Sequence, residues 1–319
     1  MLITEIFRNL WPPIKFNVKP GSNVVIVSDP MTDSDITQCL MCAIWAAGAP
    51  PTLITIPTPR VSDQLSSAVS AAVMEADLLV AATSRPISRT RGVQAARDKG
   101  VQYLAMGGVT PETLLTGSIL ADYEELFNTT MKYAKLIDDG NAVHVTSSAG
   151  TDLKFSIAGR RCLPLNGRID EVSNSVGIPS GEAATAPVEG TAEGVAVIDG
   201  GMHEIGIITE PIVMKIEKGF VVEIEGGAQA GQLRELLQES GDENSYNIAE
   251  FAFGTNSASS VTHNIQEYKN KLGTIHLALG NNLNLFGNTK SKTHMDAIMM
   301  KPTVTIDGLV VLENGVPQI

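Results

Sequence analysis

The sequence predicts an α/β protein with two domains: an N-terminal doubly wound domain on a parallel sheet, and a C-terminal domain that is mainly antiparallel α+β. The chain has 319 residues and 43% hydrophobic content, which is enough for two cores. Buried-type strands alternate with helical patterns up to residue 137, and short strands with hairpin signals follow Gly140. We therefore expect domains at 1–140 and 141–319.

The first half has the alternating pattern of a doubly wound sheet. Four short apolar runs are typical of strands buried in a parallel sheet, at residues 23–28, 52–56, 77–82 and 101–105. Helical patterns lie between these runs or follow the last one, at residues 34–47, 62–75, 90–98 and 120–137. The turn from Asp29 to Asp35 lacks the glycines that let a backbone approach a pyrophosphate. We interpret this half as a scaffold domain.

The second half has the pattern of an antiparallel sheet. Several short segments alternate apolar and polar residues with period two, at residues 142–146, 152–156, 195–199, 211–216 and 219–225. Asp307-Gly308 and Asn314-Gly315 are hairpin turn signals. Residues 229–239 form one helical pattern with leucines on one face.

Charge and composition exclude several classes of partner. A net charge of −12 argues against nucleic acid and against an anionic membrane, since both require basic patches. No apolar run reaches the roughly 18 residues of a membrane span. Three cysteines, an odd number, and the lack of a signal-peptide pattern favour a reducing cytoplasm. We expect a cytoplasmic protein with a small-molecule or small-peptide ligand.

The stretch 273–296 contains the first candidate metal ligands. His294 and Asp296 are two residues apart, so on an extended segment their side chains leave the same face. His276 lies in a strand-like run that ends at the turn beginning with Gly280. Imidazoles and a carboxylate at strand ends suit a first-row divalent metal. Histidines that merely cap strands are the alternative.

Two further acids extend this candidate set. Glu182 follows directly on a Pro-Ser-Gly turn, and Glu250 lies in an apolar segment between Ile248 and Phe253. A carboxylate in such surroundings requires a partner or becomes protonated. Together with the two histidines and Asp296, these acids have the composition of a site for two close divalent cations bridged by a carboxylate.

The segments that carry these residues resemble the successive signatures of one metallopeptidase family, that of aminopeptidase T and aminopeptidase S, which includes leucyl aminopeptidase-like enzymes. The similarity covers roughly residues 142–319. It lies in five ordered motifs, GEAATAPVEGTAEGVAVID, AEFAFGTN, GTIHLALGNN, GNTKSKTHMD and PTVTIDGLVVLENG.

The resemblance implies a two-metal aminopeptidase-like hydrolase, often a homodimer, with Zn, Co or Mn as its ions. Glu182 would bridge both metals, His276 and Asp296 would join it on one metal, and Glu250 and His294 on the other. A water activated by both ions would attack the amide of an N-terminal residue or a small amide. Glu250 would be the general base if no metal binds it tightly; otherwise the metal-bound hydroxide would attack directly. Glu182 would share the catalytic role.

One position departs from that family and opens two alternatives. The peptidases have a tyrosine shortly after the first histidine, and Leu283 stands there in this chain. A dihydroxypyridine ring-cleaving dioxygenase is similar to the same family and uses one Fe(II), for which two histidines and one carboxylate are suited. Because Glu182 and Glu250 are both present, we favour two metals. A non-catalytic metal-binding relative is the third hypothesis.

Other polar residues are weaker candidates. Arg160 or Arg161 is expected to bind a substrate carboxylate or to have a structural role. Asn288 and Ser291 are candidates for orienting His294 from outside the ligand set. Three further histidines receive only a minor functional expectation, namely His144, His203 and His263.

Overall fold

The computed structural model describes residues 2–60, 64–170, 173–260 and 264–319, which form two compact units. The first unit comprises residues 1–127 with 165–180, and the second comprises 128–164 with 181–319. Residues 165–180 belong to the first unit because β8 (Ser175–Gly177) pairs with β4 (Gln102–Ala105). This division differs from the expected boundary near residue 140, since the first unit ends within helix α5 (Tyr123–Asp139).

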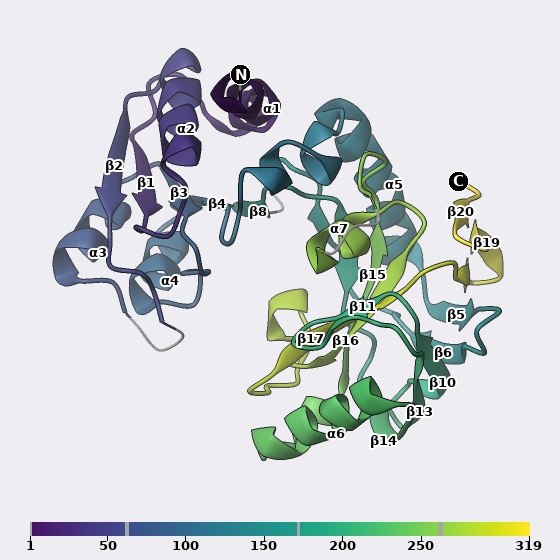
Figure 1. The fold of residues 1–319 in the computed structure, drawn as a ribbon. Helices are drawn as coiled ribbons and strands as arrows, with labels where there is room; N and C mark the ends of the chain where they lie inside the picture. The colour runs from purple at the N-terminus through teal and green to yellow at the C-terminus, as the bar shows by residue number, and fades with distance from the viewer. Residues whose placement is uncertain (1, 61–63, 171–172, 261–263) are drawn as a thin grey trace. The chain divides into compact units, whose positions relative to one another are not determined.

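The first unit is a parallel sheet with helices on it, as the alternating pattern predicted. Its strand order is β2-β1-β3-β4-β8, with β1 (Val24–Ser28), β2 (Pro51–Thr55) and β3 (Leu78–Ala82). The helices are α1 (Leu2–Asn17), α2 (Ser34–Ala46), α3 (Ser67–Met74) and α4 (Arg91–Asp98), with short 3₁₀ turns η1 (Glu112–Leu114) and η2 (Gly117–Leu120). Helices α1 and α2 pack together, and so do α3 and α4 (Figure 1).

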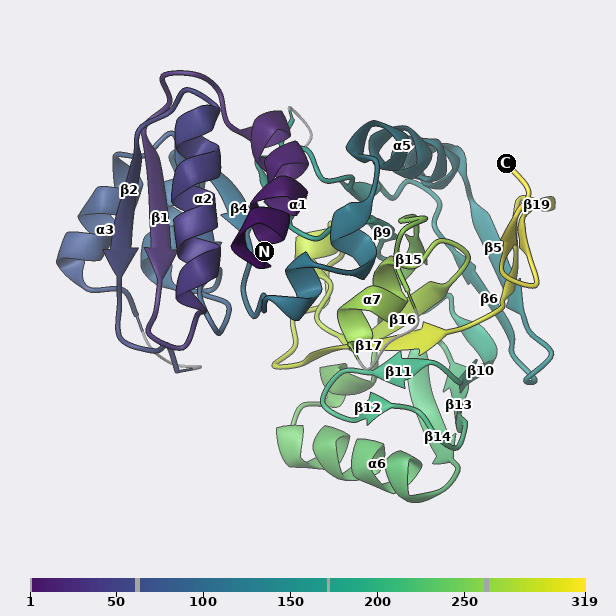
Figure 2. The same ribbon diagram turned by 45° about the horizontal axis from the view of Figure 1, so that its top comes forward.

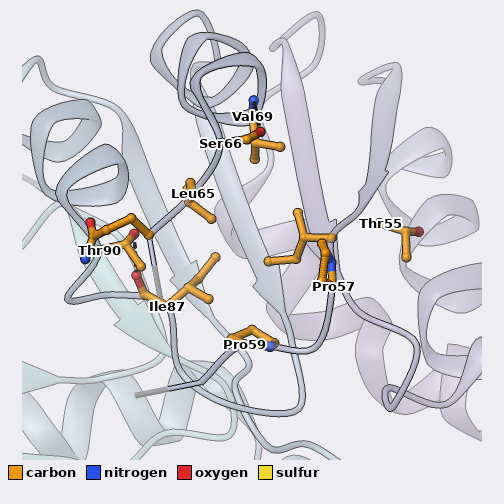
Figure 3. Close-up of a pocket in the computed structure, with 10 residues that line it drawn as sticks. Thr55, Pro57, Pro59, Leu65, Ser66, Val69, Ile87 and Thr90 are labelled. Atoms are coloured by element: carbon orange, nitrogen blue, oxygen red, sulfur yellow. Dashed lines mark hydrogen bonds between the residues drawn. The ribbon is translucent and has the colours of Figure 1, made fainter. Parts of the chain in front are cut away.

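A cavity of about 330 Å³ opens beyond the carboxyl ends of β2 and β3 in the first unit (Figure 3). Two of its polar side chains, Ser66 and Thr90, cap the adjoining helices. Ser66 accepts a hydrogen bond from the amide of Val69, and Thr90 accepts one from the amide of Val93. The cavity therefore presents mostly apolar surface from residues such as Ile56.

The second unit contains two sheets, and the fold class predicted from the sequence is confirmed. One has the order β14-β13-β10-β6-β5-β18-β19-β20, and the other has the order β12-β11-β17-β16-β15-β9-β7. The strands of the first sheet are β5 (Ala142–Thr146), β6 (Asp152–Ser156), β10 (Glu193–Ile198), β13 (Ile212–Glu217), β14 (Phe220–Glu225), β18 (Thr303–Ile306), β19 (Leu309–Glu313) and β20 (Val316–Pro317). Those of the second are β7 (Leu163–Leu165), β9 (Glu182–Thr185), β11 (Gly201–Met202), β12 (Gly206–Ile207), β15 (Ile248–Gly254), β16 (Ile275–Gly280) and β17 (His294–Met299).

Short helical elements flank these two sheets. Helix α6 (Ala228–Ser240) packs on β13 and β14, and α7 (Ile265–Asn270) packs on β15 and β11 (Figure 2). The 3₁₀ turns are η3 (Glu243–Tyr246) and η4 (Leu283–Leu285). Throughout the described ranges, every helix is too short or too polar to cross a membrane.

The core of the second unit lies between its two sheets. Phe251 of β15 meets Phe155 of β6 edge-on, with ring centroids 5.1 Å apart, and Phe253 lies 4.9 Å from Phe251. Leu277 and Met299 from neighbouring strands belong to the same apolar cluster. In β15 the residues at 251 and 253 therefore face the core, and the alternate residues face away from it.

Phe251→Ala should lower the free energy of unfolding by about 3–5 kcal/mol, because it opens a cavity between the two sheets. Urea unfolding followed by far-ultraviolet circular dichroism measures the change. Phe220→Ala is the matched control, since Phe220 is 37% exposed on the edge strand β14. Equal losses of stability in the two variants would contradict the placement of the core.

Candidate metal centre

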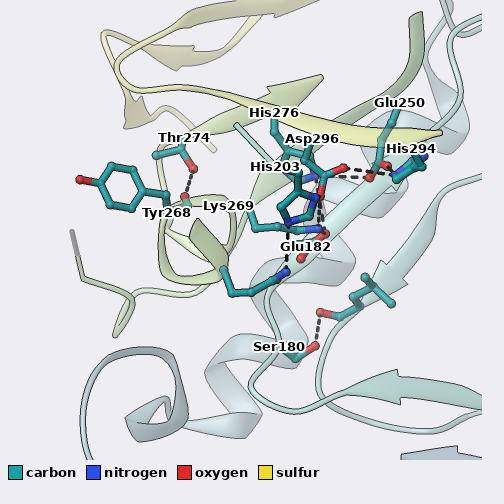
Figure 4. A network of polar contacts seen from close by, with 12 residues as sticks. Ser180, Glu182, His203, Glu250, Tyr268, Lys269, Thr274, His276, His294 and Asp296 are labelled. Atoms are coloured by element: carbon teal, nitrogen blue, oxygen red, sulfur yellow. Dashed lines mark hydrogen bonds and ion pairs between the residues drawn. The ribbon is translucent and has the colours of Figure 1, made fainter. Parts of the chain in front are cut away.

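The five predicted ligands come together on one face of the second sheet, the face turned away from the aromatic core (Figure 4). They come from four adjacent strands in the order β17, β16, β15 and β9. We call this group the ligand cluster, and its members are Glu182, Glu250, His276, His294 and Asp296.

The register of β16 and β17 explains how two histidines and an aspartate share this face. Asp296 lies opposite Ala278, and His294 lies opposite Gly280. Residues directly opposite in an antiparallel pair point to the same face, and so do residues two apart on one strand. His276 is two residues before Ala278, so its side chain joins those of Asp296 and His294.

The two glutamates reach the same face through β15 and β9. Glu250 lies opposite Ala278, and Glu182 lies opposite Gly254. Ala252 lies between Glu250 and Gly254 on β15, opposite His276. The residues among the ligands are thus alanine or glycine, which leaves space above the sheet for long ionisable side chains.

Glu250 is the centre of the ligand cluster. Its Oε1 lies 3.3 Å from Nε2 of His276, and its Oε2 lies 2.9 Å from Nε2 of His294. The ligand atoms form two groups of three residues, and within each group they all lie within 4.8 Å of one another. The groups are Glu182–Glu250–His276 and Glu250–His294–Asp296. Glu250, rather than Glu182, is the residue common to both sets.

Asp296 connects the cluster to two residues that the motifs did not identify as ligands. Its Oδ1 lies 3.2 Å from Nε2 of His294, while its Oδ2 lies 2.7 Å from Nζ of Lys269 and 3.4 Å from Nδ1 of His203. Lys269 also lies 3.3 Å from Oε2 of Glu182. Sequence reasoning overlooked Lys269, because nothing in its short polar segment distinguishes it from neighbouring lysines.

Burial and charge pairing set the protonation of the cluster. Burial opposes ionisation of Glu250, but hydrogen bonds from His276 and His294 lower its pKa overall. Burial likewise opposes ionisation of Asp296, yet the charge of Lys269 holds its pKa well below the usual range. Burial would lower the pKa of His294, but Asp296 and Glu250 raise it to about 10. The site is therefore a network of compensating charges.

The donor set suits a divalent metal ion. Within the described ranges, Oδ1 of Asp296 is buried without a hydrogen-bond partner, although it lies 3.2 Å from Nε2 of His294. A buried polar atom without a partner is costly, and a bound ion or water is one way to satisfy it. Imidazole and carboxylate together favour first-row metals such as Zn, Mn or Fe. The clustered atoms thus form groups that could hold a metal ion.

A backbone carbonyl orients His294. Its Nδ1 lies 2.8 Å from the carbonyl oxygen of Asn281, which directs Nε2 toward Glu250 and Asp296. The amide of Ser291 donates to Oδ1 of Asn281 at 3.4 Å, and its hydroxyl oxygen accepts from the amide of Thr293 at 3.3 Å. Its hydroxyl bonds to Asp242 at 2.8 Å. The connection expected between Ser291 and His294 is therefore indirect.

Arg160 and Asn288 belong to a latch that holds the loop between β16 and β17. Arg160 pairs with Glu189 and donates to the carbonyl oxygen of Phe286 at 3.0 Å. Glu189 accepts from the amide of Asn288 at 2.7 Å and from the side chain of Asn282 at 2.9 Å. Burial opposes ionisation of Glu189, but these hydrogen bonds lower its pKa to about 2. The latch fixes the loop that leads to His294.

The remaining candidates lie outside the ligand cluster. The guanidinium of Arg161 lies over the ring of Phe286, 5.4 Å from its centroid. Leu283, in η4, is 46% exposed. His144 pairs with Asp152 at 2.7 Å on the other sheet, and His263 lies outside the described residues.

Fold and site together define a chain with a carboxylate–imidazole cluster on an antiparallel sheet and a separate doubly wound unit. The sequence model of the 2,5-dihydroxypyridine 5,6-dioxygenase family matches residues 14–318, so the chain belongs to that family. A curated relative, the 2,5-dihydroxypyridine 5,6-dioxygenase of Pseudomonas putida KT2440, is 27% identical over 192 residues. That match spans 56% of this chain and only 55% of the relative, about half its length.

Two solved structures share the fold. The 2,5-dihydroxypyridine dioxygenase from Pseudomonas putida KT2440 matches with a TM-score of 0.83 and 20% identity, over 99% of this chain and 96% of that one. Wild-type AmpT from Thermus thermophilus matches with a TM-score of 0.70 and 19% identity, over 98% and 99%. The resemblance to the aminopeptidase T family is thus supported as a likeness of fold.

The expectation of a metallo-aminopeptidase-like hydrolase is wrong. The family model and the curated relative both indicate a dioxygenase, an oxidoreductase, rather than a metallopeptidase or leucyl aminopeptidase. The error has a physical reason. The motifs that carried the resemblance encode the ligand strands of a shared fold, and one set of oxygen and nitrogen ligands serves different reactions. The departure at Leu283 pointed toward the alternative.

Glu250→Gln should weaken metal binding by more than about 100-fold, because loss of a direct ligand exceeds the 10–100-fold cost of losing an outer partner. Titration of the metal-free protein with Co²⁺, followed by visible absorption, measures the affinity. Glu239→Gln, on the exposed side of α6, is the control and should bind as the wild type does. Unchanged affinity in Glu250→Gln would remove Glu250 from the ligands.

Glu189→Ala should loosen the loop between β16 and β17, because Arg160, Asn282 and the amide of Asn288 lose their common acceptor. We expect faster amide hydrogen exchange in peptides covering residues 281–293, measured by mass spectrometry. Glu239→Ala should leave this exchange unchanged. Equal protection in both variants would show that the latch does not hold the loop.

Proposed function

We propose that this chain is a ring-cleaving dioxygenase that acts on a small dihydroxylated pyridine-type ring with Fe(II) as its metal. Family membership supports the reaction class, and the substrate named for the curated relative supports the ring. The observation that carries the proposal is the convergence of two imidazoles, His276 and His294, on the carboxylate of Glu250.

Two histidines and one carboxylate are the ligand type of non-haem Fe(II) oxygenases. In this chain His276 and His294 supply the imidazoles, and Glu250 and Asp296 supply carboxylates beside them. When bound, Fe(II) supplies the one-electron redox chemistry that O₂ needs in order to react with an organic ring. The chain's own residues must bind and orient that ring.

His203 lies beside the cluster and fits this task, whereas Leu283, in the loop that precedes β17, counts against amide hydrolysis. His203 is 31% exposed beside Asp296, and its Nε2 lies 3.5 Å from the side-chain amide of Gln266. It is thus the candidate for accepting a proton from a ring hydroxyl. Leu283 lacks the hydroxyl that a peptidase would use to stabilise an oxyanion, a group worth roughly 10²–10³ in rate.

Anaerobically prepared protein loaded with Fe(II) should consume one O₂ for each 2,5-dihydroxypyridine opened. With ¹⁸O₂, mass spectrometry should find both oxygen atoms in the product. Protein loaded with Zn²⁺ is the control and should be inactive, because Zn²⁺ has no redox chemistry. His294→Ala should lower the rate by more than about 100-fold through loss of a ligand.

Hydrolysis of leucyl or phenylalanyl amides should stay at background with any of these ions. Absence of oxygen uptake by the Fe(II)-loaded protein, across dihydroxylated pyridines and benzenes, would contradict the proposed reaction.

A further inference from the structure

One edge of the first unit carries no charge. The run from Ile36 to Pro59 contains no Asp, Glu, Lys, Arg or His, and it is the longest stretch without a charged residue in a chain of net charge −12. This run supplies helix α2 from Ile36 onward and the whole of strand β2, and the two elements pack together (Figure 2). Protein surfaces are normally rich in charged side chains, so an uncharged surface on an acidic chain indicates a contact with another molecule.

Strand β2 is an open sheet edge. It stands at one end of the order β2-β1-β3-β4-β8, so its outer backbone groups have no strand partner among the residues that the structure describes. Proteins usually protect such an edge with charged side chains, an internal proline or a bulge. Strand β2 has its proline only at its first position, Pro51, and it pairs with β1 without a break in register as far as Thr55. The outer edge of β2 can therefore pair with a further strand.

Leu53, in the middle of β2, is 40% exposed on the side of the sheet where α2 lies. Because the chain steps from β1 to β2 in one direction and from β2 to β3 in the other, right-handed crossovers place α2 and α3 on opposite faces. Ile54 packs in the apolar cluster that includes Val73 of α3. Its neighbour Leu53 therefore points to the other face, which α2 covers.

Trp45, near the end of α2, is 70% exposed. Helix α1 covers one flank of α2, where Sγ of Cys39 lies 3.3 Å from the carbonyl oxygen of Ile3. Trp45 is six positions further along α2 and is therefore turned about 120° away from that flank. An indole and a leucine side chain thus lie exposed on the α2 face of the unit that ends in the open strand.

We propose that this edge is an interface between two copies of the chain, joined about a twofold axis by antiparallel pairing of their β2 strands. A twofold interface uses the same surface on both copies, so that surface must be complementary to itself. Leu53 is the central residue of Pro51–Thr55. Pairing centred on it sets Leu53 opposite the same residue of the second copy and Thr52 opposite Ile54. These are uncharged pairs of strand-forming residues, which stabilise a sheet.

Charge favours a second copy over a different partner. Each chain carries a net charge of −12, so two copies repel one another wherever their acidic surfaces meet. Contact through the run from Ile36 to Pro59 places no like charges opposite one another. A basic partner would instead be recognised by acidic side chains, which this run lacks.

Sedimentation velocity tests the interface in the whole protein. The wild type should have the mass of two chains. Leu53→Lys should weaken the association by more than about 10-fold, because it sets two ammonium groups opposite one another at the axis. Leu309→Lys is the matched control, since Leu309 is 54% exposed on β19 of the second unit, and it should remain dimeric. Circular dichroism checks that both variants fold.

Disulfide trapping tests the register of the pairing without adding charge. Cys42→Ser first removes the exposed thiol, since Cys39 and Cys162 are buried. Leu53→Cys in this background should form a covalent dimer under mild oxidation, because side chains directly opposite in an antiparallel pair have Cβ atoms about 4.5–5.5 Å apart, close to the spacing of a disulfide. Leu309→Cys in the same background should stay a single chain on non-reducing electrophoresis.

A monomeric wild type would overturn the inference and would leave this edge to a different protein. A dimer that keeps its affinity in folded Leu53→Lys and forms no disulfide at position 53 would overturn it as well, because the two copies would then meet elsewhere. Neither result depends on the metal or on turnover, so both are independent of the proposed reaction.

Discussion

Three carboxylates buried side by side on one face of a sheet are the constraint on which the rest of the second unit depends. Glu182, Glu250 and Asp296 are each 5% exposed or less, and like charges in such a place are unstable without compensation. The neighbouring imidazoles and the ammonium of Lys269 compensate these charges, and a bound metal ion would compensate them further. Small residues between the ligands, Gly254 among them, leave the space in which these groups meet.

Much of this arrangement could be predicted from the sequence, because it results from the period of two along a strand. In β15, Phe251 and Phe253 face the core, and Glu250 lies on the opposite face with the other members of the ligand cluster. The H-x-D spacing of His294 and Asp296 has the same origin. Strand β8 and Lys269 could not be predicted in this way. Strand β8 depends on pairing with β4, which lies far from it in the sequence, and Lys269 depends on the approach of α7 to Gly254.

The reaction class could not be predicted from the ligands, because the solved structures of a 2,5-dihydroxypyridine dioxygenase and of AmpT share this fold, and one set of imidazole and carboxylate ligands serves different reactions. The residues around the ligands distinguish the two chemistries. A two-metal hydrolase requires both cation positions and an oxyanion donor, whereas this chain has an ammonium between Glu182 and Asp296 and a leucine at position 283. The latch of Arg160 and Glu189 positions the loop that carries that leucine.

The binding of one iron where His276, His294 and the neighbouring carboxylates meet is the central claim. Crystals of the Fe(II)-loaded protein, grown without oxygen and measured on both sides of the iron absorption edge, test it most directly. We predict one anomalous peak, in contact with His276, His294 and at least one of the carboxylates beside them, Glu250 or Asp296. Two peaks about 3.5–4 Å apart, the spacing of two-metal sites, or one peak away from the two imidazoles, would contradict this claim.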